Sequence, residues 1–396
     1  MKQEILFAEA KNLKTEFTFS KLDPEEKEIV AALVSWSNPA KYTGQIEQLH
    51  GRSVVIKSPT RHVSDPTDFF MEKYDGIQIF GFGGARAMIR EGVAEVPSKI
   101  EITQLNETNH SNELAAIIQL RDFDDKGRLK TWNRPYAPMH GMDQTEAKAR
   151  KAITVKIADY HSKVLKEQGV PFFSVPEFVA EGFFPDKKDP SGNPLVFQAY
   201  RVPIIDRFPS QLIQTAQSES VEIMFHRLQT FSFLAGRFFR TLHQTFDLAY
   251  MDGHLGNMSL LRTEKKAGIY ATDLGSAKDI KSHPFAEKFR GIDIYTYIAT
   301  SRSLMASYAG FLEARHGQDK AIKDFQNLLT FISISGLASG YFETEITKGE
   351  NMSTIKVIKN GEKFGNDLMK IFSPNSSPQV SLDMFEVYLK EITENN

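Results

Sequence analysis

The secondary structure that the residue pattern predicts changes along the chain, and this change constrains the fold more than any other feature of the sequence. Strand-like segments dominate residues 52 to about 135, and helical periodicity dominates beyond Pro203. A run of strands followed by a run of helices is typical of α+β proteins. We therefore expect an α+β fold with two lobes, a small β-rich lobe and a larger helical one.

These patterns divide the 396 residues into three segments. The expected segments are an N-terminal helical extension at 1–52, a β-rich lobe with one long helix at 53–200, and a helical lobe at 201–396.

Capping signals and apolar spacing place the helices. Asp23-Pro24-Glu25-Glu26 combines an N-cap carboxylate, a first-turn proline and acids near the positive end of the helix dipole. We expect a helix at about 24–37, then a second short helix that runs to Gly51. A segment without helix breakers, ending before Gly169, predicts a long helix at 143–168.

Short runs rich in β-branched residues and bounded by turn residues predict the strands. Asp124-Asp125-Lys126-Gly127 is a turn sequence and predicts a hairpin. The expected strands are 53–57, 77–80, 87–89, 100–102, 175–179 and 195–200, with a loop at 186–194.

Composition narrows the possible functions. The 48 basic and 50 acidic residues give a net charge of −2, which argues against broad capture of nucleic acid. The chain has no cysteine, which excludes disulfides, thiolate metal sites and a cysteine nucleophile. We find no apolar run long enough for a membrane span and no secretory signal, so we expect a cytoplasmic protein.

The segment from Tyr250 to Gly275 carries the residues suited to phosphoryl transfer. This chemistry needs a carboxylate that orients the acceptor hydroxyl and oxygen ligands that hold Mg²⁺ on the phosphates. Asp252 and Asn257 are five residues apart in a predicted loop, and Asp273 ends a strand one hairpin later. A chance grouping of ordinary loop residues is the alternative interpretation.

The order Leu-His, Asp-x-His-x-Gly-Asn, hairpin and Asp-x-Gly resembles the protein-kinase-like superfamily, in particular its aminoglycoside-phosphotransferase and bacterial effector-kinase branches. The resemblance covers residues 76–300 and implies a two-lobed fold that uses ATP with Mg²⁺, or Mn²⁺ in its place. It makes Asp252 the catalytic residue and Asn257 and Asp273 the metal ligands. It makes His254 and Asp293 structural supports of the loop, although an exposed carboxylate is the alternative for Asp293.

The same resemblance places a nucleotide site in the β-rich lobe. Gly81 and Gly83 lie where a glycine loop would cover the phosphates, although a plain hairpin turn fits them too. Lys57 or Lys99 would anchor the phosphates, with a solvated strand lysine as the alternative for both. A hinge at 198–202, including Gln198 and Tyr200, would offer backbone groups to adenine.

The long helix carries a run of basic residues. Such a run is usually a solvated face, and the functional alternative is a polyanion site. Effector kinases are implied to act in a host cell, and inositol hexakisphosphate activates a kinase of that branch. Met251 replaces the arginine that often receives an activation-loop phosphate, so another switch is expected. The residues of the polyanion alternative are Lys148, Arg150, Lys151 and Lys156.

Three functions remain open from the sequence. The first is an atypical protein kinase acting on Ser/Thr hydroxyls. The second is a small-molecule phosphotransferase whose acceptor is a soluble alcohol. The third is a nucleotidyl transferase, or a catalytically idle scaffold, on the same fold.

Overall fold

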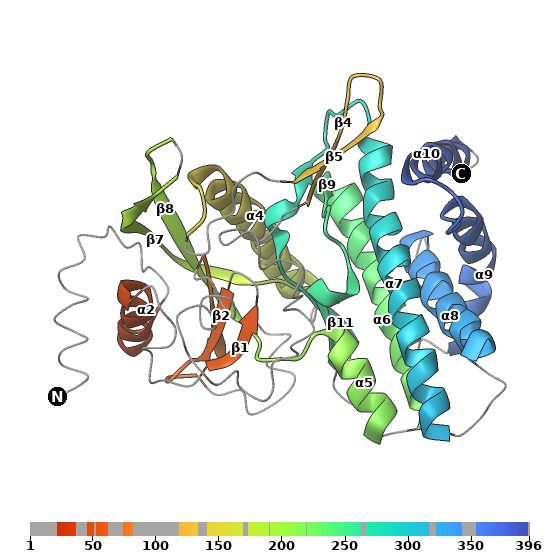
Figure 1. Cartoon of the computed structure of the whole chain (residues 1–396), viewed down its shortest axis with the longest axis horizontal. Coiled ribbons are helices and arrows are strands. Elements are labelled where there is room, and N and C mark those ends of the chain that lie inside the picture. The colour runs from red at the N-terminus through yellow and green to blue at the C-terminus, as the bar shows by residue number, and fades with distance from the viewer. Residues whose placement is uncertain are drawn as a thin grey trace. The chain divides into compact units, whose positions relative to one another are not determined.

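The structure is a computed structural model with a mixed α+β fold (Figure 1). It describes residues 22–36, 46–50, 53–61, 74–81, 119–133, 141–168, 173–189, 191–218, 220–262, 267–316, 322–342 and 354–394.

The chain divides into two compact units, each considered by itself. Unit 1 draws on Met1–Leu120, Thr131–Lys163 and Val175–Ile204. Unit 2 draws on Arg121–Lys130, Val164–Ser174 and Ile205–Asn396. The units are therefore not simple consecutive segments, because two short stretches group with residues far along the chain.

Unit 1 is built on a five-stranded antiparallel sheet in the order β1-β2-β3-β8-β7. Strands β2, β3 and β8 are buried along almost their whole length, as strands covered on both faces are. The elements are α2 (Pro24–Trp36), β1 (Ile46–His50), β2 (Ser53–Lys57), β3 (Gly76–Phe80), α4 (Gln144–Gln168), β7 (Glu177–Lys188) and β8 (Pro194–Val202).

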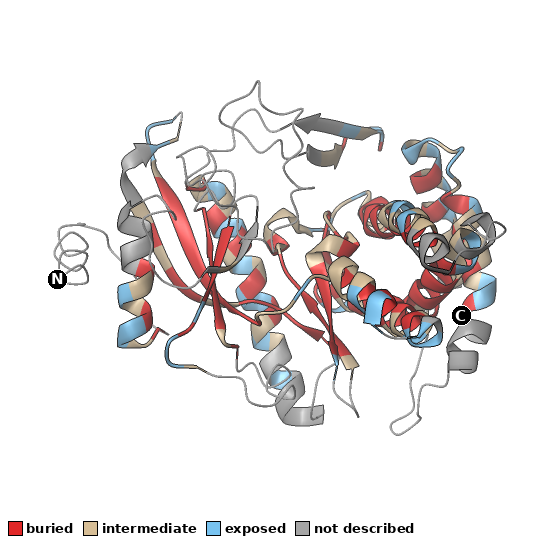
Figure 2. Ribbon diagram, turned by 60° about the horizontal axis from the view of Figure 1, so that its bottom comes forward, coloured by how far each residue is buried: buried red, intermediate tan, exposed pale blue. Residues whose placement is uncertain are grey.

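Two side chains of β8 show which helix covers which face of this sheet. Gln198 donates to the carbonyl oxygen of Ala147 in α4. Arg201 binds Glu26 in α2 through two hydrogen bonds of 2.6 and 2.7 Å. Because the two β8 residues are an odd number apart on a strand, they point to opposite faces. The sheet therefore lies between α2 and α4 (Figure 2).

Unit 2 consists mainly of helices, with small sheets of two or three strands. Its elements are the β4–β5 hairpin (Gln119–Phe123 and Leu129–Asn133), β6 (Phe173–Ser174), α5 (Phe208–Ser218), α6 (Val221–Thr245), β9 (Leu248–Ala249), β10 (Met258–Arg262), β11 (Ala267–Ala271), β12 (Lys278–Asp279), α7 (Ala286–His316), α8 (Ile322–Phe342), α9 (Thr354–Ile371) and α10 (Pro378–Glu394). The β4–β5 hairpin is divided between the two units, because Gln119, Leu120 and residues 131–133 belong to unit 1.

Helix α6 forms the centre of unit 2 and packs closely on α8. A Cβ on Gly340 would lie 2.0 Å from the Phe233 carbonyl oxygen, and one on Gly236 would lie 2.1 Å from the Leu337 carbonyl oxygen. Only glycine allows these backbones to approach so closely. The apolar stripe of α6, including Phe231 and Phe238, is fully buried. This close packing fixes the end of α6, from which the candidate site begins.

The structure corrects two expectations about local structure. Residues 46–50 form strand β1 and not the end of a short helix, because they pair with β2 along its edge. Strand β7 continues through Lys188, beyond the expected end at 179, and its turn closes on Asp189, which accepts N–H bonds from Ser191 and Asn193. In both cases pairing with a neighbouring strand decides the conformation. The expected strands at 87–89 and 100–102 lie outside the described residues.

Among the residues that the structure describes, no helix combines the length and apolarity that crossing a membrane requires.

Candidate functional site

The candidate site lies in unit 2, on the loop between β9 and β10. The β9 strand pairs with β12, and β10 pairs with β11, so the chain on both sides of the loop is held in a ladder. The 3₁₀ turn Leu255–Asn257 closes the loop. Asp273 begins the 3₁₀ turn Leu274–Ser276 after β11.

A buried carboxylate on α7 fixes the start of this loop. Asp293 is fully buried and accepts the backbone N–H groups of Tyr250 and Met251, each at 2.6 Å. The same carboxylate lies 2.9 Å from Nε2 of His243 in α6. Hydrogen bonds to a carboxylate are about twice as strong as neutral ones, so this group is well suited to hold the loop in one conformation. Asp293 therefore joins the start of the loop to α6 and α7 through these contacts.

His243 is itself fixed on both ring nitrogens. Its Nδ1 lies 2.8 Å from the hydroxyl of Tyr341 on α8, and its Nε2 faces Asp293. Burial lowers the pKa of His243, although Asp293 raises it. A neutral ring that donates from Nε2 to Asp293 and accepts from the Tyr341 hydroxyl satisfies both contacts. Tyr341 was missed in the sequence because no local pattern connects it to residue 243.

The backbone is strained at two positions of the site. Met251 has φ 68° and Asp273 has φ 56°, in the left-handed region that non-glycine residues seldom occupy. Such conformations persist where surrounding contacts determine them, and they cluster at functional sites. The Asp293 carboxylate supplies that contact for Met251, because it binds the Met251 N–H directly.

Asp252, Asn257 and Asp273 lie in one part of unit 2, where contacts of Asn257 connect them. The Asn257 side-chain amide donates to Oδ2 of Asp252 at 3.0 Å and to its backbone oxygen at 3.1 Å. The backbone N–H of Thr272 donates to the Asn257 carbonyl oxygen at 3.0 Å, which joins the end of β11 to the loop. Asp273 is the residue after Thr272. Hydrogen bonds therefore join Asp252 to Asn257, and Asn257 to the residue before Asp273.

Burial and two charged neighbours have the largest effects on the pKa of Asp252. Burial raises the pKa of Asp252, His254 lowers it, and the like charge of Asp273 raises it further. His254 places Nε2 at 3.7 Å from Asp252 Oδ1. Solvent still reaches 41% of the Asp252 side chain, so an acceptor can approach it. The net effect is a carboxylate that binds a proton more readily than an ordinary aspartate does.

Two arginines near the site were not anticipated from the sequence. Arg121, in the β4–β5 hairpin, donates to Thr296 on α7 at 2.8 Å, and its charge lowers the Asp252 pKa. Burial lowers the pKa of Arg207, whereas Tyr270, Tyr250 and Asp273 raise it. Both arginines are far in sequence from the acids they influence, so only the folded chain reveals them.

The donor set is suited to a hard divalent cation. The amide nitrogen of Asn257 is engaged by Asp252, which leaves its side-chain oxygen as the ligand atom. Mg²⁺ prefers carboxylate and amide oxygens, and a cation would relieve the repulsion between Asp252 and Asp273. No cluster of three or more His, Asp or Glu side chains forms a metal site among the described residues. Asn257 and Asp273 would therefore need further oxygens from a bound phosphate or water.

The predicted hinge in unit 1 is not supported by its geometry. Residues 198–201 form an interior part of β8, paired with β3 on one side and β7 on the other. Gln198 and Tyr200 are buried, and the Tyr200 hydroxyl donates to Gln198. Their backbone groups face neighbouring strands, so they are not available to adenine. Strand β8 ends at Val202, and beyond it the Ile204 N–H donates to the Asp75 carboxylate at 3.2 Å.

The predicted phosphate loop is corrected in part. Gly81 is buried, and a Cβ there would lie 2.9 Å from the Val196 carbonyl oxygen and 3.2 Å from the Gly141 Cα. Its φ of 82° serves a tight turn against β8, not an exposed phosphate cradle. Lys57 ends β2 with an exposed side chain. Gly83 and Lys99 lie outside the described residues.

The predicted polyanion site is also corrected. Arg150 is buried, with its guanidinium 4.2 Å from the centre of the Phe80 ring and 3.6 Å from Glu146. Lys151 pairs with Glu181 at 3.4 Å. Lys148 and Lys156 are exposed. Because two of the four basic residues are engaged with the sheet, the four do not form one exposed cluster.

The comparisons with known proteins identify no family for this chain. No protein-family model matches the chain, and no curated protein matches it. The solved structures that are similar to the chain include the following two. The structure described as WaaP in complex with acyl carrier protein has 15% identity and a TM-score of 0.26, with 55% of this chain and 83% of that chain covered. A Toxoplasma gondii specific rhoptry antigen kinase domain has 11% identity and a TM-score of 0.28, with 93% of both chains covered. Scores at this level do not establish a shared fold.

Proposed function

We propose that this chain is a Mg²⁺-dependent phosphotransferase that moves the γ-phosphoryl group of ATP to an acceptor hydroxyl. The observation that carries the proposal is the hydrogen bond from Asn257 to Asp252, together with the tie from Thr272 to Asn257. These contacts bring together a carboxylate that would face the acceptor and two side chains whose oxygens would bind the metal. Phosphoryl transfer needs little more from a protein than such positioning and charge.

In this proposal each residue has one task. Asp252 accepts a hydrogen bond from the acceptor hydroxyl and takes its proton as the new P–O bond forms. The bond from the γ-phosphorus to the β–γ bridging oxygen breaks in the same transfer, and ADP leaves. Asn257 and Asp273 would hold Mg²⁺, which when bound neutralises charge on the phosphates. Asp293 keeps the loop backbone in place through Tyr250 and Met251. His254, at 3.7 Å, lowers the pKa of Asp252 and so favours its basic form.

We further propose that the acceptor is a Ser or Thr hydroxyl of a protein. The partial exposure of Asp252 supports an acceptor that approaches from solvent. Activation by an inositol polyphosphate is not part of the proposal, because Arg150 and Lys151 are engaged with unit 1. Action in a host cell and a cytoplasmic location stay predictions from the sequence alone.

An acceptor screen with γ-labelled ATP and Mg²⁺ tests the acceptor class. The expected result is label on Ser or Thr of a protein, including the chain itself, that is lost in Asp252→Asn. Label on soluble alcohols without label on protein would overturn the protein-kinase assignment and favour a small-molecule phosphotransferase. Lys370→Met serves as a control, because that lysine is exposed on α9 and has no role in this proposal.

A further inference from the structure

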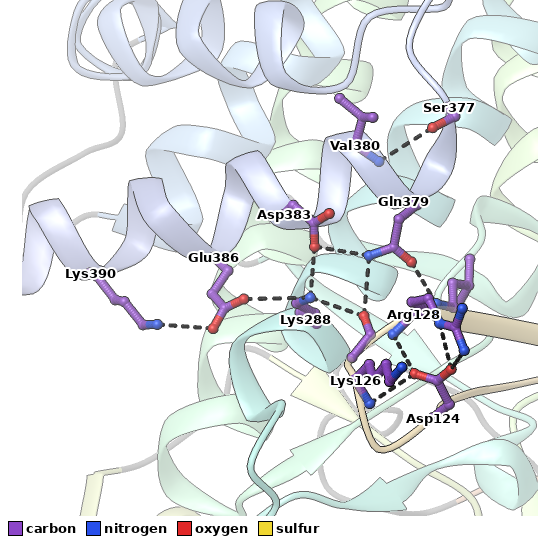
Figure 3. A network of polar contacts seen from close by, with 12 residues as sticks. Asp124, Lys126, Arg128, Lys288, Ser377, Gln379, Val380, Asp383, Glu386 and Lys390 are labelled. Carbon is purple, nitrogen blue, oxygen red and sulfur yellow. Dashed lines mark hydrogen bonds and ion pairs between the residues drawn. The ribbon is translucent and has the colours of Figure 1, made fainter.

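The turn of the β4–β5 hairpin, residues 121–130, docks on two helices of unit 2. Phe123 packs edge-on against Phe289 of α7, with ring centres 4.8 Å apart. Lys288 of α7 donates to the Gly127 carbonyl oxygen at 2.9 Å and pairs with Asp383 of α10 at 2.6 Å (Figure 3). We call residues 121–130 the docked turn.

The docked turn is held in shape by its own contacts. Asp124 accepts backbone N–H bonds from Lys126 and Arg128 and binds the Arg128 guanidinium at 2.7 Å (Figure 3). The backbone hydrogen bond from Arg128, together with the other donors, lowers the pKa of Asp124 to about 2 despite the effect of desolvation. The turn therefore keeps this charge at any ordinary pH. It is a rigid support and not a loose loop.

The docked turn also contacts the chain that follows Asp273. Asp122 Oδ1 lies 2.6 Å from Nζ of Lys278, and the same ammonium lies 4.4 Å from the centre of the Phe289 ring. Lys278 begins β12, five residues after Asp273. A single lysine thus joins the docked turn, α7 and the segment next to the predicted metal ligand.

Strand β12 contains only two residues, which pair with Leu248 and Ala249 of β9, just before the Asp252 loop. The next residue, Ile280, is buried and donates its N–H to the Asp247 carbonyl oxygen at 2.8 Å. So short a ladder contributes little stability by itself. Short segments with few contacts open locally unless another group ties them down. The Asp122–Lys278 pair is the ion pair that ties β12 to the docked turn among the described residues.

The exposure of the two side chains indicates whether this ion pair stabilises the whole chain or only the segment around β12. Both side chains are about one-third exposed, 31% for Lys278 and 35% for Asp122. Ion pairs with this much solvent contribute little to the free energy of unfolding. Removing the pair should therefore leave the fold intact while it loosens β12 and the residues before it.

We propose that Asp122 is a positioning residue that holds Asp273 in its working place through the ion pair with Lys278. This inference rests on the proposed function, because it assigns to the docked turn a task in the same site. Asp122 acts on the segment after Asp273, and the β12–β9 pairing passes the constraint to the Asp252 loop. The turn is thus part of the site, although it lies more than a hundred residues earlier in the chain.

The test combines amide hydrogen exchange with steady-state kinetics on the full chain. Asp122→Asn and Lys278→Met should raise exchange of the amides in 274–282 several-fold and lower kcat about fivefold or more, with Tm changed little. Asp122→Glu should restore both readouts, because the carboxylate can still reach the ammonium. Lys370→Met, which removes an exposed lysine 4.0 Å from Asp367 on α9, is the matched control and should change neither.

The two readouts separate the possible failures. Unchanged exchange in 274–282 for both Asp122→Asn and Lys278→Met would overturn the positioning role. Raised exchange with unchanged kcat would overturn it as well, because the segment would then move without effect on transfer. Raised exchange in the two variants, together with a wild-type chain that transfers no phosphate to any acceptor, would support the contact and overturn the proposed function.

Discussion

Asp252 and Asp273 place like charges in one small site, and single substitutions separate their contributions. Asp252→Asn removes the acceptor-facing base, so we expect kcat to fall by about 10²- to 10⁴-fold. The same change removes a repulsion on Asp273, so stabilisation by Mg-ATP should persist or increase. Asp273→Asn removes a metal ligand and should abolish that stabilisation. Thermal unfolding with and without Mg-ATP, alongside turnover, measures both effects. Equal loss of nucleotide binding in the two variants would contradict the assigned roles.

His243 gives a prediction about stability and pH. Burial lowers its pKa below the ordinary 6.5, so the unfolded chain binds a proton that the folded chain does not. This contribution is complete above about pH 6.5 and is lost as pH falls from there towards the folded-state pKa. His243→Gln is less stable at pH 7.5 because its contacts to Asp293 and Tyr341 are weakened. Its deficit relative to wild type should shrink below pH 6.5, by at most about 1.4 kcal/mol per pH unit. Urea unfolding at several pH values measures the gap, and a gap that stays constant or widens in acid would be inconsistent with a neutral buried ring.

The sequence could place the three central residues of the site but not their partners. Asp252 and Asn257 lie in one loop, so their hydrogen bond follows from short-range spacing. Arg121, by contrast, reaches Thr296 across 175 residues, and nothing local in either segment encodes that contact. Tyr341 meets His243 only because glycines let α6 and α8 pack closely. Long-range partners of this kind follow from the assembled fold and not from periodicity.

Helix α2 depends on a buried ion pair for its attachment to the sheet of unit 1. Glu26 is fully buried, and burial would raise its pKa. Hydrogen bonds from Arg201 and Ser58 outweigh that effect and hold the pKa below 4.5. Removing one partner leaves an uncompensated buried charge, so Arg201→Met or Glu26→Leu should each destabilise the chain. The expected loss for Arg201→Met is about 3–5 kcal/mol.

A double-mutant cycle tests this account of α2. The pair Glu26→Leu with Arg201→Met removes both charges, so its loss should be well below the sum of the two single losses. Urea unfolding of the full chain measures all four proteins. Lys57→Met, an exposed position of the same sheet, should change the free energy of unfolding by less than about 0.5 kcal/mol. Additive losses across the cycle would show that the two side chains do not act as a pair.

Elements were predictable from sequence where a strong local signal agreed with the tertiary fold. The N-terminus of α2 follows from Asp23 and Pro24, and α4 begins within one residue of the expected position. Strand β1 was missed because its five residues carry a weak alternation and gain their conformation by pairing with β2. Gly81 was misread because a glycine cluster indicates a turn without indicating what the turn packs against.

At the scale of the whole molecule, the order of strands and helices predicted a mixed α+β chain of two parts. The expected boundary at residue 200 stays a prediction, and the last stretch of unit 1 ends at Ile204. The assignment of residues 121–130 and 164–174 to unit 2 was not predictable, because their partners lie on α7, α10 and β11. A turn motif predicts the conformation of the turn itself. The surface on which the turn docks depends on helices that lie far along the chain.

The central claim is that the Asp252 site transfers the terminal phosphoryl group of ATP. The most direct test gives the purified full chain Mg²⁺ and ATP labelled at either the γ- or the α-phosphate. We expect the γ-label to appear on an acceptor, the α-label to stay with the nucleotide, and transfer to be lost in Asp252→Asn. Transfer of the α-label would indicate a nucleotidyl transferase, and the absence of transfer from either position would indicate a scaffold; either result would contradict the claim.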